Sequence, residues 1–469
     1  MDKNCKIDAA SRDKPIFESK IDDRKITMES LSQGGTNAAL LQLLQQAIGF
    51  HTAGELDRAE SIYREVLARD PVHPIALHYL GIFLHQRGQH EEGIQSIRLS
   101  CALQPGNANW HNDLGNVLFA LKEFEEACDA YQASLDANPG DHVVWNNLGS
   151  SQLQCNDMEG AIDSFKQAVE LVPEFGPALI HLGNIYEAAG DKMSSSHYQC
   201  RAFVLPPLEG KSREMLGTCF YFLGRLEEAA DIYRTWMEEE PGNPIAAHMY
   251  AACSQSDVPG RASDSYVEQH FDRYAETFND NLVGSLAYRG PQLMGQGLTA
   301  IGIGGKQYDI LDVGCGTGLC ASFAAPYARS LHGVDLSGKM LEQARARGGY
   351  DQLIKQEITE YMAGQPQAFD IVLSADTLIY FGGLEDAFGA AATTLRKNGY
   401  FLFTVETMTE GNHAGDLQLH PSGRYRHSAA YVMQCLADAG LDLISMEDVT
   451  LREEIRQPVA GMLVISRKI

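Results

Sequence analysis

The sequence predicts a multidomain chain in which an all-α solenoid of helix pairs precedes an α/β domain. Three observations predict this fold class. Six prolines recur every 34 residues, strand-like and helix-like segments alternate in the second half, and no helix separates the last two strand-like runs. A fixed period of this length is typical of stacked helical repeats, and the alternation is typical of a largely parallel sheet. The two adjacent final strands predict an antiparallel hairpin.

Length and composition agree with several folded units. A chain of 469 residues is too long for one compact core, and 44% hydrophobic with 21% charged residues is ordinary for globular protein. The 62 acidic and 37 basic residues give a formal net charge of −25. This charge would repel a phosphate backbone, so no nucleic-acid partner is expected.

Ten cysteines are scattered without C-x-x-C pairs and without histidines at ligand spacing. We therefore expect reduced, buried thiols and no metal site. The N-terminus lacks an apolar signal region, and no apolar run reaches 18 residues. These features predict a cytoplasmic protein without a membrane span.

The internal repeat is carried by a set of small and large residues at fixed positions. The prolines are Pro71, Pro105, Pro139, Pro173, Pro207 and Pro241. A Leu-Gly pair recurs with the same period, with glycines at Gly81, Gly115, Gly149, Gly183 and Gly217. Sixteen residues after each glycine there is usually a large side chain: Ile97, Tyr131, Phe165 and Tyr233, with Gln199 as the exception. A small residue allows close approach of a bulky one from the paired helix, and proline ends the second helix.

This pattern resembles tetratricopeptide (TPR) repeats over about residues 40–243, as one weak and five clear repeats. We assign residues 1–36 to a flexible tail. Residues 37–255 are assigned to a TPR solenoid of about six repeats plus a capping helix. Residues 256–469 then form the second domain, with lid helices within 264–300. The resemblance implies a protein or peptide partner.

Polar residues gather on the first helix of each repeat, which builds the inner surface of such a solenoid. They are His78, Asn112, Asn116, Asn146, Asn147, His181 and Asn184. Asparagine donates and accepts hydrogen bonds, which suits a peptide backbone, although solvated helix faces explain the same residues. The lysine and arginine that bind a C-terminal carboxylate in other TPR proteins are missing, which disfavours a chaperone-tail adaptor.

The second half contains seven strand-like runs with helices between them. The strands are expected at Tyr308–Val313, Leu331–Asp335, Gln352–Glu357, Phe369–Ser374, Tyr400–Glu406, Leu441–Met446 and Met462–Ser466. The clearest helices are expected at Ser337–Arg347, Leu384–Leu395 and Ser428–Ala439.

The first of these strands runs into a glycine loop, I-L-D-V-G-C-G-T-G, from residue 310 to residue 318. Glycine lets the backbone turn sharply and lets a ligand approach where a Cβ would intrude. The segment resembles motif I of class I S-adenosylmethionine-dependent methyltransferases. The resemblance implies a Rossmann-like fold, S-adenosylmethionine as cofactor and S-adenosylhomocysteine as product. It places five residues at the cofactor: Asp312, Gly314, Cys315, Gly316 and Gly318.

An acid ends the second strand, 17 residues after the last glycine (335 − 318 = 17). The carboxylate of Asp335 can accept both ribose hydroxyls, and Leu336 would pack on the adenine. A helix cap is the alternative role for Asp335, but Ser337 is better placed for it.

Two further strand ends complete the expected cofactor site. The resemblance places Glu357 and Ile358 at the adenine, with Glu357 accepting its amino group. It places Ser374, Ala375 and Asp376 at the methionine ammonium. Asp376 can neutralise cofactor charge, or it can be an acid at a helix N-terminus.

The segment H-F-D-R-Y-A-E-T-F, residues 270–278, resembles a stretch that covers the cofactor in small-molecule methyltransferases. Tyr274 is the residue expected to touch the cofactor. Amphipathic packing at helical spacing is the alternative.

The methyl acceptor is expected beside the loop after the fifth strand. There G-R-Y-R-H-S, residues 423–428, together with the repeats, resembles predicted TPR-containing methyltransferases. Loops at the carboxyl ends of parallel strands carry the sites of α/β sheets. Arg424, Tyr425 and His427 are therefore predicted to face the acceptor, with His427 or Glu406 as a general base. Alternatively, His427 begins a helix and Arg424 pairs with a surface acid.

Two other functions compete with methyl transfer. A scaffold that binds S-adenosylmethionine without transferring its methyl group would keep the same loop and acid. A nicotinamide-dependent oxidoreductase is disfavoured by the G-x-G-x-G spacing and by the predicted terminal hairpin.

Overall fold

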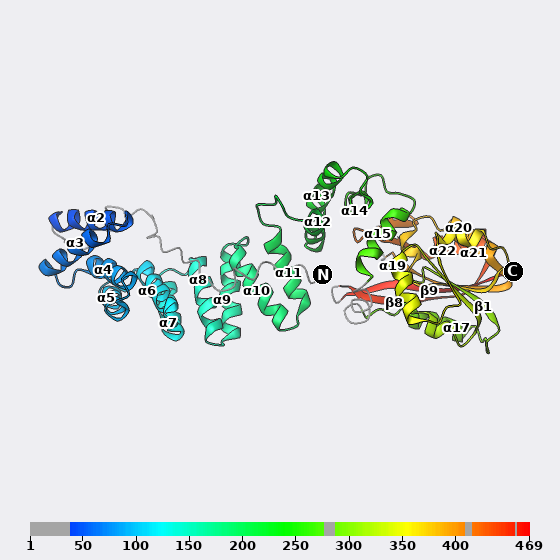
Figure 1. Cartoon of the computed structure of the whole chain (residues 1–469), viewed down its shortest axis with the longest axis horizontal. Coiled ribbons are helices and arrows are strands. Elements are labelled where there is room, and N and C mark those ends of the chain that lie inside the picture. Colours follow the sequence, from blue (N-terminus) through cyan, green and yellow to red (C-terminus); the bar gives the residue numbers. More distant parts are fainter. Residues whose placement is uncertain (1–37, 276–286, 409–414, 455–456) are drawn as a thin grey trace. The chain divides into compact units, whose positions relative to one another are not determined.

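A computed structural model of the chain describes residues 38–275, 287–408, 415–454 and 457–469. Contacts within the chain divide it into two compact units, Met1–Leu205 and Pro206–Ile469 (Figure 1). The last repeat therefore belongs to the same compact unit as the α/β sheet. Among the described residues, no helix combines the length and the apolar character needed to cross a bilayer.

The first unit consists of paired antiparallel helices of 12 to 15 residues. They are α2 (Ala38–Thr52), α3 (Leu56–Arg69), α4 (Pro74–Gln86), α5 (His90–Leu103), α6 (Ala108–Ala120), α7 (Phe124–Ala137), α8 (His142–Gln154), α9 (Met158–Leu171), α10 (Gly176–Ala188) and α11 (Lys192–Phe203). The predicted all-α repeat is confirmed.

The repeat glycines lie where the two helices of a pair approach most closely. A Cβ on Gly115 would lie 2.6 Å from Tyr131 Cε1, and a Cβ on Gly149 would lie 2.9 Å from Phe165 Cε1. Both rings are fully buried. The 34-residue period therefore reflects one repeated contact, in which a large side chain of the second helix covers the backbone of the first.

Replacing Gly115 by Ala is expected to destabilise the first unit by about 1–3 kcal/mol, because the new methyl group overpacks a closed interface. The better helix propensity of alanine offsets about 1 kcal/mol at most. Thermal unfolding measures the effect. Gly106→Ala is the control, because nothing lies within 4 Å of its Cβ position. Equal unfolding temperatures for both variants would contradict the proposed packing constraint.

The second unit begins with three helices of the repeat pattern and continues into the α/β fold. These helices are α12 (Arg213–Phe222), α13 (Leu226–Glu239) and α14 (Pro244–Ser254). The following helices are α15 (Asp264–Tyr274), α17 (Gly290–Ala300), α18 (Ala321–Ala324), α19 (Gly338–Arg347), α20 (Ile358–Ala363), α21 (Glu385–Thr394) and α22 (Ala429–Asp438).

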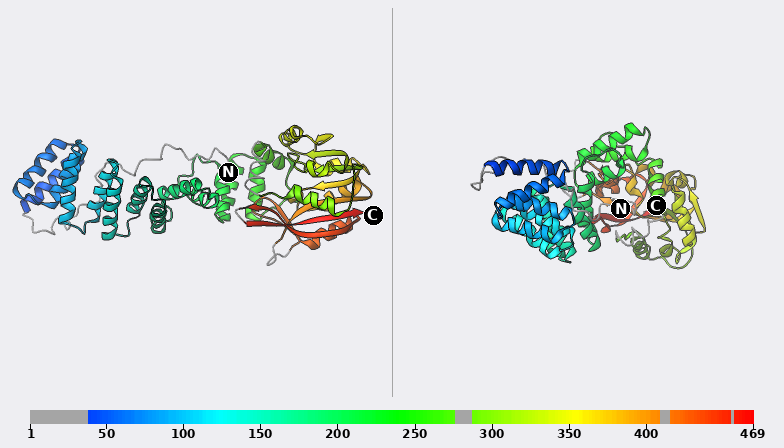
Figure 2. Two further views of the ribbon diagram at one scale, coloured as in Figure 1. Left: turned by 90° about the horizontal axis from the view of Figure 1, so that it is seen from below. Right: turned by 60° about the vertical axis from the view of Figure 1, so that its left-hand side comes forward.

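The sheet has nine strands, and Figure 2 shows their twist. They are β1 (Tyr308–Val313), β2 (Ala328–Asp335), β3 (Gln352–Lys355), β4 (Phe369–Ser374), β5 (Leu395–Thr407), β6 (Leu417–Leu419), β7 (Tyr425–His427), β8 (Leu441–Glu454) and β9 (Gln457–Lys468). Five parallel strands run in the order β3-β2-β1-β4-β5. The antiparallel pair β8 and β9 joins this sheet through β9 and β5, which confirms the predicted terminal hairpin.

A second, shorter hairpin was not predicted. Strands β6 and β7 pair antiparallel, and β7 pairs with the last two residues of β5. Each strand has three residues, which is too short for an alternating pattern to be recognised in a sequence. This hairpin brings the 420–427 segment to the carboxyl end of β5.

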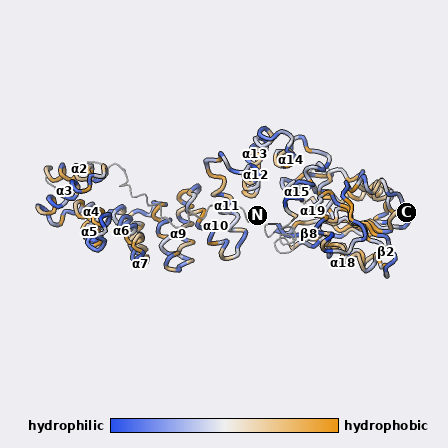
Figure 3. Tube along the Cα trace, in the orientation of Figure 1, coloured by the Kyte–Doolittle hydropathy of each residue, from blue (hydrophilic) through white to orange (hydrophobic). Residues whose placement is uncertain are grey.

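Apolar residues of the central strands form the core of the α/β fold, as the hydropathy colours of Figure 3 show. Ile310, Ile371 and Leu402, from β1, β4 and β5, are completely buried. Helices α20, α21 and α22 lie on one side of the sheet and α17 lies on the other (Figure 1). Burial on both faces explains why these strands are almost uniformly apolar.

Candidate active site

A cavity of about 280 Å³ lies at the carboxyl ends of β1, β2 and β4. This is the edge at which parallel α/β sheets bind ligands. Ten of the predicted site residues line it: Gly314, Cys315, Gly316, Asp335, Leu336, Glu357, Ile358, Ala375, Asp376 and Arg424.

The glycine loop after β1 adopts a backbone that only glycine accepts easily. Gly314, Gly316 and Gly318 have φ values of +70°, +52° and +80°. A Cβ on Gly314 would lie 2.1 Å from Thr377 Oγ1, whereas nothing lies within 4 Å of a Cβ on Gly316. The loop therefore packs tightly against the β4 side at Gly314 and leaves room at Gly316, where it lines the cavity.

Asp335 is held at the end of β2 by two backbone N–H groups. Gly316 N donates to its Oδ2 and Ser337 N donates to its Oδ1, both at 2.8 Å. Ser337 is the residue that caps α19, because its Oγ accepts from Met340 N at 3.1 Å. Each carboxylate oxygen retains a lone pair. Burial raises the pKa of Asp335.

Glu357 presents an unsatisfied oxygen to the cavity side. Its Oε2 accepts from Glu360 N at 2.8 Å and so caps α20. Its Oε1 is buried and has no hydrogen-bond partner among the described residues, and Arg261 Nη1 lies 3.9 Å from it, within ion-pair range but too far for a hydrogen bond. A buried acceptor without a donor is costly, so a ligand amino group at this position would be favoured. The residues present thus fit an adenosine group.

Asp376, just after β4, has a strained backbone. Its φ of +58° is unusual for a residue other than glycine, and such strain is frequent at functional sites. Both carboxylate oxygens accept from Arg452 Nη1, at 3.0 and 2.7 Å. Burial raises the pKa of Asp376, and Arg452 opposes this shift. Its carboxylate is therefore engaged by an arginine rather than by a helix N-terminus.

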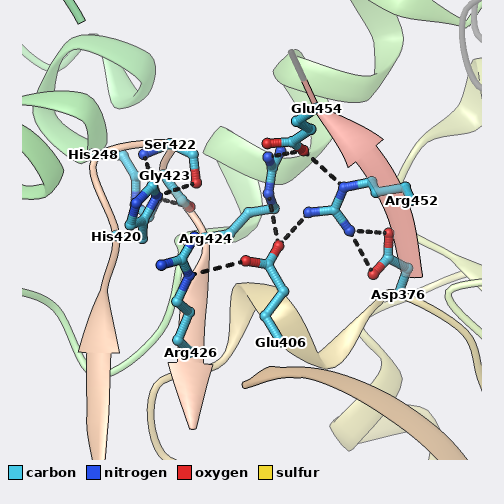
Figure 4. A network of polar contacts seen from close by, with 10 residues as sticks. All are labelled: His248, Asp376, Glu406, His420, Ser422, Gly423, Arg424, Arg426, Arg452 and Glu454. Atoms are coloured by element: carbon cyan, nitrogen blue, oxygen red, sulfur yellow. Dashed lines mark hydrogen bonds and ion pairs between the residues drawn. The ribbon is translucent and has the colours of Figure 1, made fainter. Parts of the chain in front are cut away.

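Asp376 belongs to a charge network beside the cavity, shown in Figure 4. Arg452 Nε donates to Glu454 Oε1 at 2.7 Å, and Arg424 Nε donates to Glu406 Oε1 at 3.0 Å. Arg452 also pairs with Glu406, and Arg424 also pairs with Glu454. Arg426 completes the charge network, 3.4 Å from Glu406 Oε2. Three carboxylates thus balance three guanidinium groups.

Glu406 is the centre of this charge network. Its side chain is 1% exposed and contacts three arginines. Burial alone would raise the pKa of Glu406, but Arg452 and Arg424 outweigh burial and lower it. A carboxylate held in this way is a weak base.

Of the four residues predicted to be catalytic, Arg424 is the one that lines the cavity. Tyr425 Oη donates to the Pro259 carbonyl at 2.6 Å. His427 is fully buried, and its Nε2 lies 3.0 Å from the Gly382 carbonyl, to which it must donate. Glu406, Tyr425 and His427 are not among the cavity's lining residues.

Asp312, Gly318 and Ser374, which were also predicted at the cofactor, are not among the lining residues. Asp312 is buried and its Oδ2 accepts from Tyr350 Oη at 2.6 Å. Gly318 packs against Ala344, and Ser374 is completely buried at the end of β4. Tyr274 ends α15, and its side chain lies outside the described residues.

Several lining residues were not predicted from the sequence, including His270, Phe271, Tyr288, Tyr380, Arg452 and Glu454. The segment containing His270 and Phe271 was recognised, but the face of α15 that points to the cavity was not. Arg452 and Glu454 lie on the extended β8, beyond the six residues predicted for that strand. Among the described residues, no group of three or more His, Cys, Asp or Glu side chains is arranged to bind a metal.

Comparison with known families agrees with this geometry. A methyltransferase-domain model matches residues 311–403, and a tetratricopeptide-repeat model matches residues 44–108, 101–142 and 112–174. The chain joins TPR repeats to a class I methyltransferase domain. The methyltransferase match begins in β1, spans the glycine loop and ends in β5.

Individual relatives match part of the chain. Methyltransferase-like protein 27 of Homo sapiens is 40% identical over 112 residues, which are 23% of this chain and 45% of that protein. The ubiquinone biosynthesis O-methyltransferase of Cupriavidus pinatubonensis is 26% identical over 167 residues, 32% of this chain and 65% of that protein. The chain thus spans less than two thirds of either relative.

Solved structures show matches to part of the chain. The S-adenosylmethionine dependent methyltransferase from Mesorhizobium loti is 21% identical, with a TM-score of 0.31. The match covers 37% of this chain and 96% of that one.

Proposed function

We propose that this protein transfers a methyl group from S-adenosylmethionine to an acceptor bound at the Arg424 side of the cavity. The observation that carries the proposal is the convergence of three groups on one cavity. These are the open backbone at Gly316, the fixed carboxylate of Asp335 and the unsatisfied Oε1 of Glu357. A glycine loop, a ribose acceptor and an adenine acceptor are what an adenosine ligand requires.

S-adenosylmethionine supplies an electrophilic methyl group on a sulfonium. The protein's residues bind and orient: Asp335 accepts from the ribose hydroxyls and Glu357 accepts from the adenine amino group. Methyl transfer is an in-line displacement, so alignment and exclusion of water are the main requirements. Phe271 and Tyr380 supply apolar walls for this purpose.

Arg424 is proposed as the acceptor-binding residue. No described residue accepts a hydrogen bond from its Nη1, while its Nε and Nη2 are engaged by Glu406 and Glu454. We assign Glu406, Tyr425 and His427 to supporting positions, since Glu406 is a weak base and His427 Nε2 is bonded to a carbonyl. If His427→Ala abolishes transfer while leaving the fold and cofactor affinity intact, a direct catalytic role for His427 is restored.

Replacing Asp335 by Asn is expected to weaken S-adenosylhomocysteine binding roughly tenfold to a hundredfold, because one charged hydrogen-bond acceptor is lost. Calorimetry on the full chain measures the affinity for S-adenosylhomocysteine. Asp386→Asn, an exposed change on α21, is the control. If the wild-type protein binds neither S-adenosylmethionine nor S-adenosylhomocysteine, the proposed function fails.

Labelling of a native lysate with methyl-labelled S-adenosylmethionine and purified protein tests transfer itself. New label that depends on the protein supports an enzyme. Binding without any new label supports the alternative of a scaffold that binds the cofactor.

We further propose that the inner surface of the repeats binds a protein or peptide. Buried side-chain oxygens of Asn112 and Asn146 have no hydrogen-bond partner among the described residues. Asn116 and Asn147 are hydrogen-bonded to each other at 3.4 Å, so they are partly used within the helical stack. Asn146 and Asn147 are 2% and 6% exposed, so both lie mainly within the helical stack. Asn184 is exposed and Asn112 is partly exposed, and a peptide backbone could bond to these two side chains.

A further inference from the structure

The turn between β6 and β7 brings Arg424 to the cavity. His420 N donates to the Arg424 carbonyl and Gly423 N donates to the His420 carbonyl, both at 2.8 Å. Gly423 has a φ of +82°, and a Cβ there would lie 3.0 Å from both Met249 Sδ and Tyr266 Oη. The turn is therefore closed against two helices, α14 and α15.

Side chains of helix α14 and of its C-terminal cap donate hydrogen bonds to both ends of this turn. His248 Nε2 donates to the Gly423 carbonyl at 2.8 Å, one residue before Arg424. Gln255 Nε2, from the residue that caps α14, donates to the Leu419 carbonyl at 2.8 Å. His248 is 5% exposed, so the carbonyl it contacts is shielded from water and depends on this donor.

The same histidine contacts the helix that covers the cavity. The His248 ring stacks on Tyr266 of α15, with ring centroids 3.9 Å apart and planes 29° apart. One helical turn later, α15 contributes His270 and Phe271 to the cavity lining. Burial lowers the pKa of His248, which keeps the ring neutral with one N–H to donate. One side chain thus joins two walls of the cavity.

We infer that His248 is a positioning residue for the acceptor side of the cavity. By bonding the Gly423 carbonyl and stacking on Tyr266, it fixes the Arg424 turn against α15. Helix α14, the last helix of the repeat array, then contributes directly to the geometry of the transfer site and does more than connect the repeats to it. This inference rests on the proposed methyl transfer, and the two can fail separately.

The test compares three variants of the full chain. His248→Phe keeps the ring and its stacking but removes the donor, and His248→Gln restores a donor N–H at similar reach. His332→Phe is the control: it makes the same change on β2, where the ring packs on Phe369 away from the cavity lining. Three quantities are measured: methyl label transferred into a native lysate, S-adenosylhomocysteine affinity by calorimetry, and amide hydrogen exchange of residues 417–427.

For His248→Phe we expect transfer to fall roughly tenfold to a hundredfold, because a displaced binding group misaligns the acceptor. S-adenosylhomocysteine affinity is expected to stay within about twofold, since Asp335 and Glu357 are untouched. Exchange in 417–427 should rise. His248→Gln should recover part of both losses, and His332→Phe should match the wild type.

Several results would overturn the positioning role. The role is excluded if methyl transfer or hydrogen exchange in His248→Phe equals that of the wild type. It is also excluded if His248→Gln transfers no more methyl label than His248→Phe. Equal losses of transfer and cofactor affinity would show general unfolding instead. If the wild-type protein transfers no label, the proposed function fails, and exchange in 417–427 alone then decides whether His248 fixes the turn.

Discussion

Arg452→Met is expected to destabilise the second unit by about 3–5 kcal/mol, because it leaves buried carboxylates without their counter-charge. The Arg452 side chain is 3% exposed and pairs with Asp376, Glu406 and Glu454. Methionine fills a similar volume, so loss of packing contributes little. Urea unfolding followed by far-UV circular dichroism measures the change.

The matched control is Arg329→Ala. Arg329 also binds a carboxylate, Asp309, but its side chain is 58% exposed and Arg396 contacts the same acid. Exposed ion pairs contribute little, so this variant should unfold close to the wild type. If Arg452→Met is no more destabilising than Arg329→Ala, the charge network is not a structural requirement and Arg452 is retained for binding alone.

The repeats and the cofactor loop could be predicted because their signals are local or periodic. The close contact of Gly115 with Tyr131 recurs every 34 residues, so each copy supports the others. The glycine loop directly follows β1 and Asp335 is the last residue of β2, so their positions follow from parallel topology. For the glycine loop and Asp335, the order of the strands along the chain was therefore sufficient to predict their place in the site.

The acceptor side could not be predicted in the same way, because it depends on the face that each side chain takes. Side chains alternate along a strand, so Tyr425 and His427 share one face of β7 and Arg426 takes the other. Tyr425 and His427 point to the Pro259 and Gly382 carbonyls, and Arg426 points to Glu406. A strand of three residues gives no pattern from which this assignment follows.

The charge network depends on contacts over long sequence separations. Arg452 meets Glu406 across 46 residues and Asp376 across 76. These contacts arise because β9 lies between β5 and β8 and brings a residue of β8 back to the cavity. The sequence predicted the hairpin, but the register that places Arg452 beside three acids comes from the folded sheet.

Replacing Asp312 is expected to increase stability, whereas replacing Arg452 is expected to decrease it. The Asp312 side chain is 1% exposed, and burial raises its pKa to about 7 from the ordinary 3.8, although Tyr350 Oη donates to it. At a pH between these two pKa values, Asp312 is protonated in the folded protein and ionised in the unfolded chain. Stability therefore falls as pH rises from about 4 to about 7, and the loss is complete above pH 7.

Asp312→Asn removes this titration and keeps an oxygen that can accept from Tyr350. Without cofactor, the variant is expected to be more stable than the wild type by roughly 4 kcal/mol at pH 8. The advantage should shrink by about 1 kcal/mol at pH 6, because the wild-type carboxyl is then mostly protonated in the folded state.

Asp309→Asn, on the same strand, is the control with the opposite sign. The hydrogen bond from Arg329 holds the pKa of Asp309 well below its usual range, so Asp309 is ionised in both states at pH 6 and pH 8. Its replacement should lower stability equally at both pH values. An Asp312→Asn variant that is less stable than the wild type at pH 8 would show that Asp312 is a stabilising, ionised group. A parallel loss of S-adenosylhomocysteine affinity in that variant would then support the cofactor role that the sequence predicts for it.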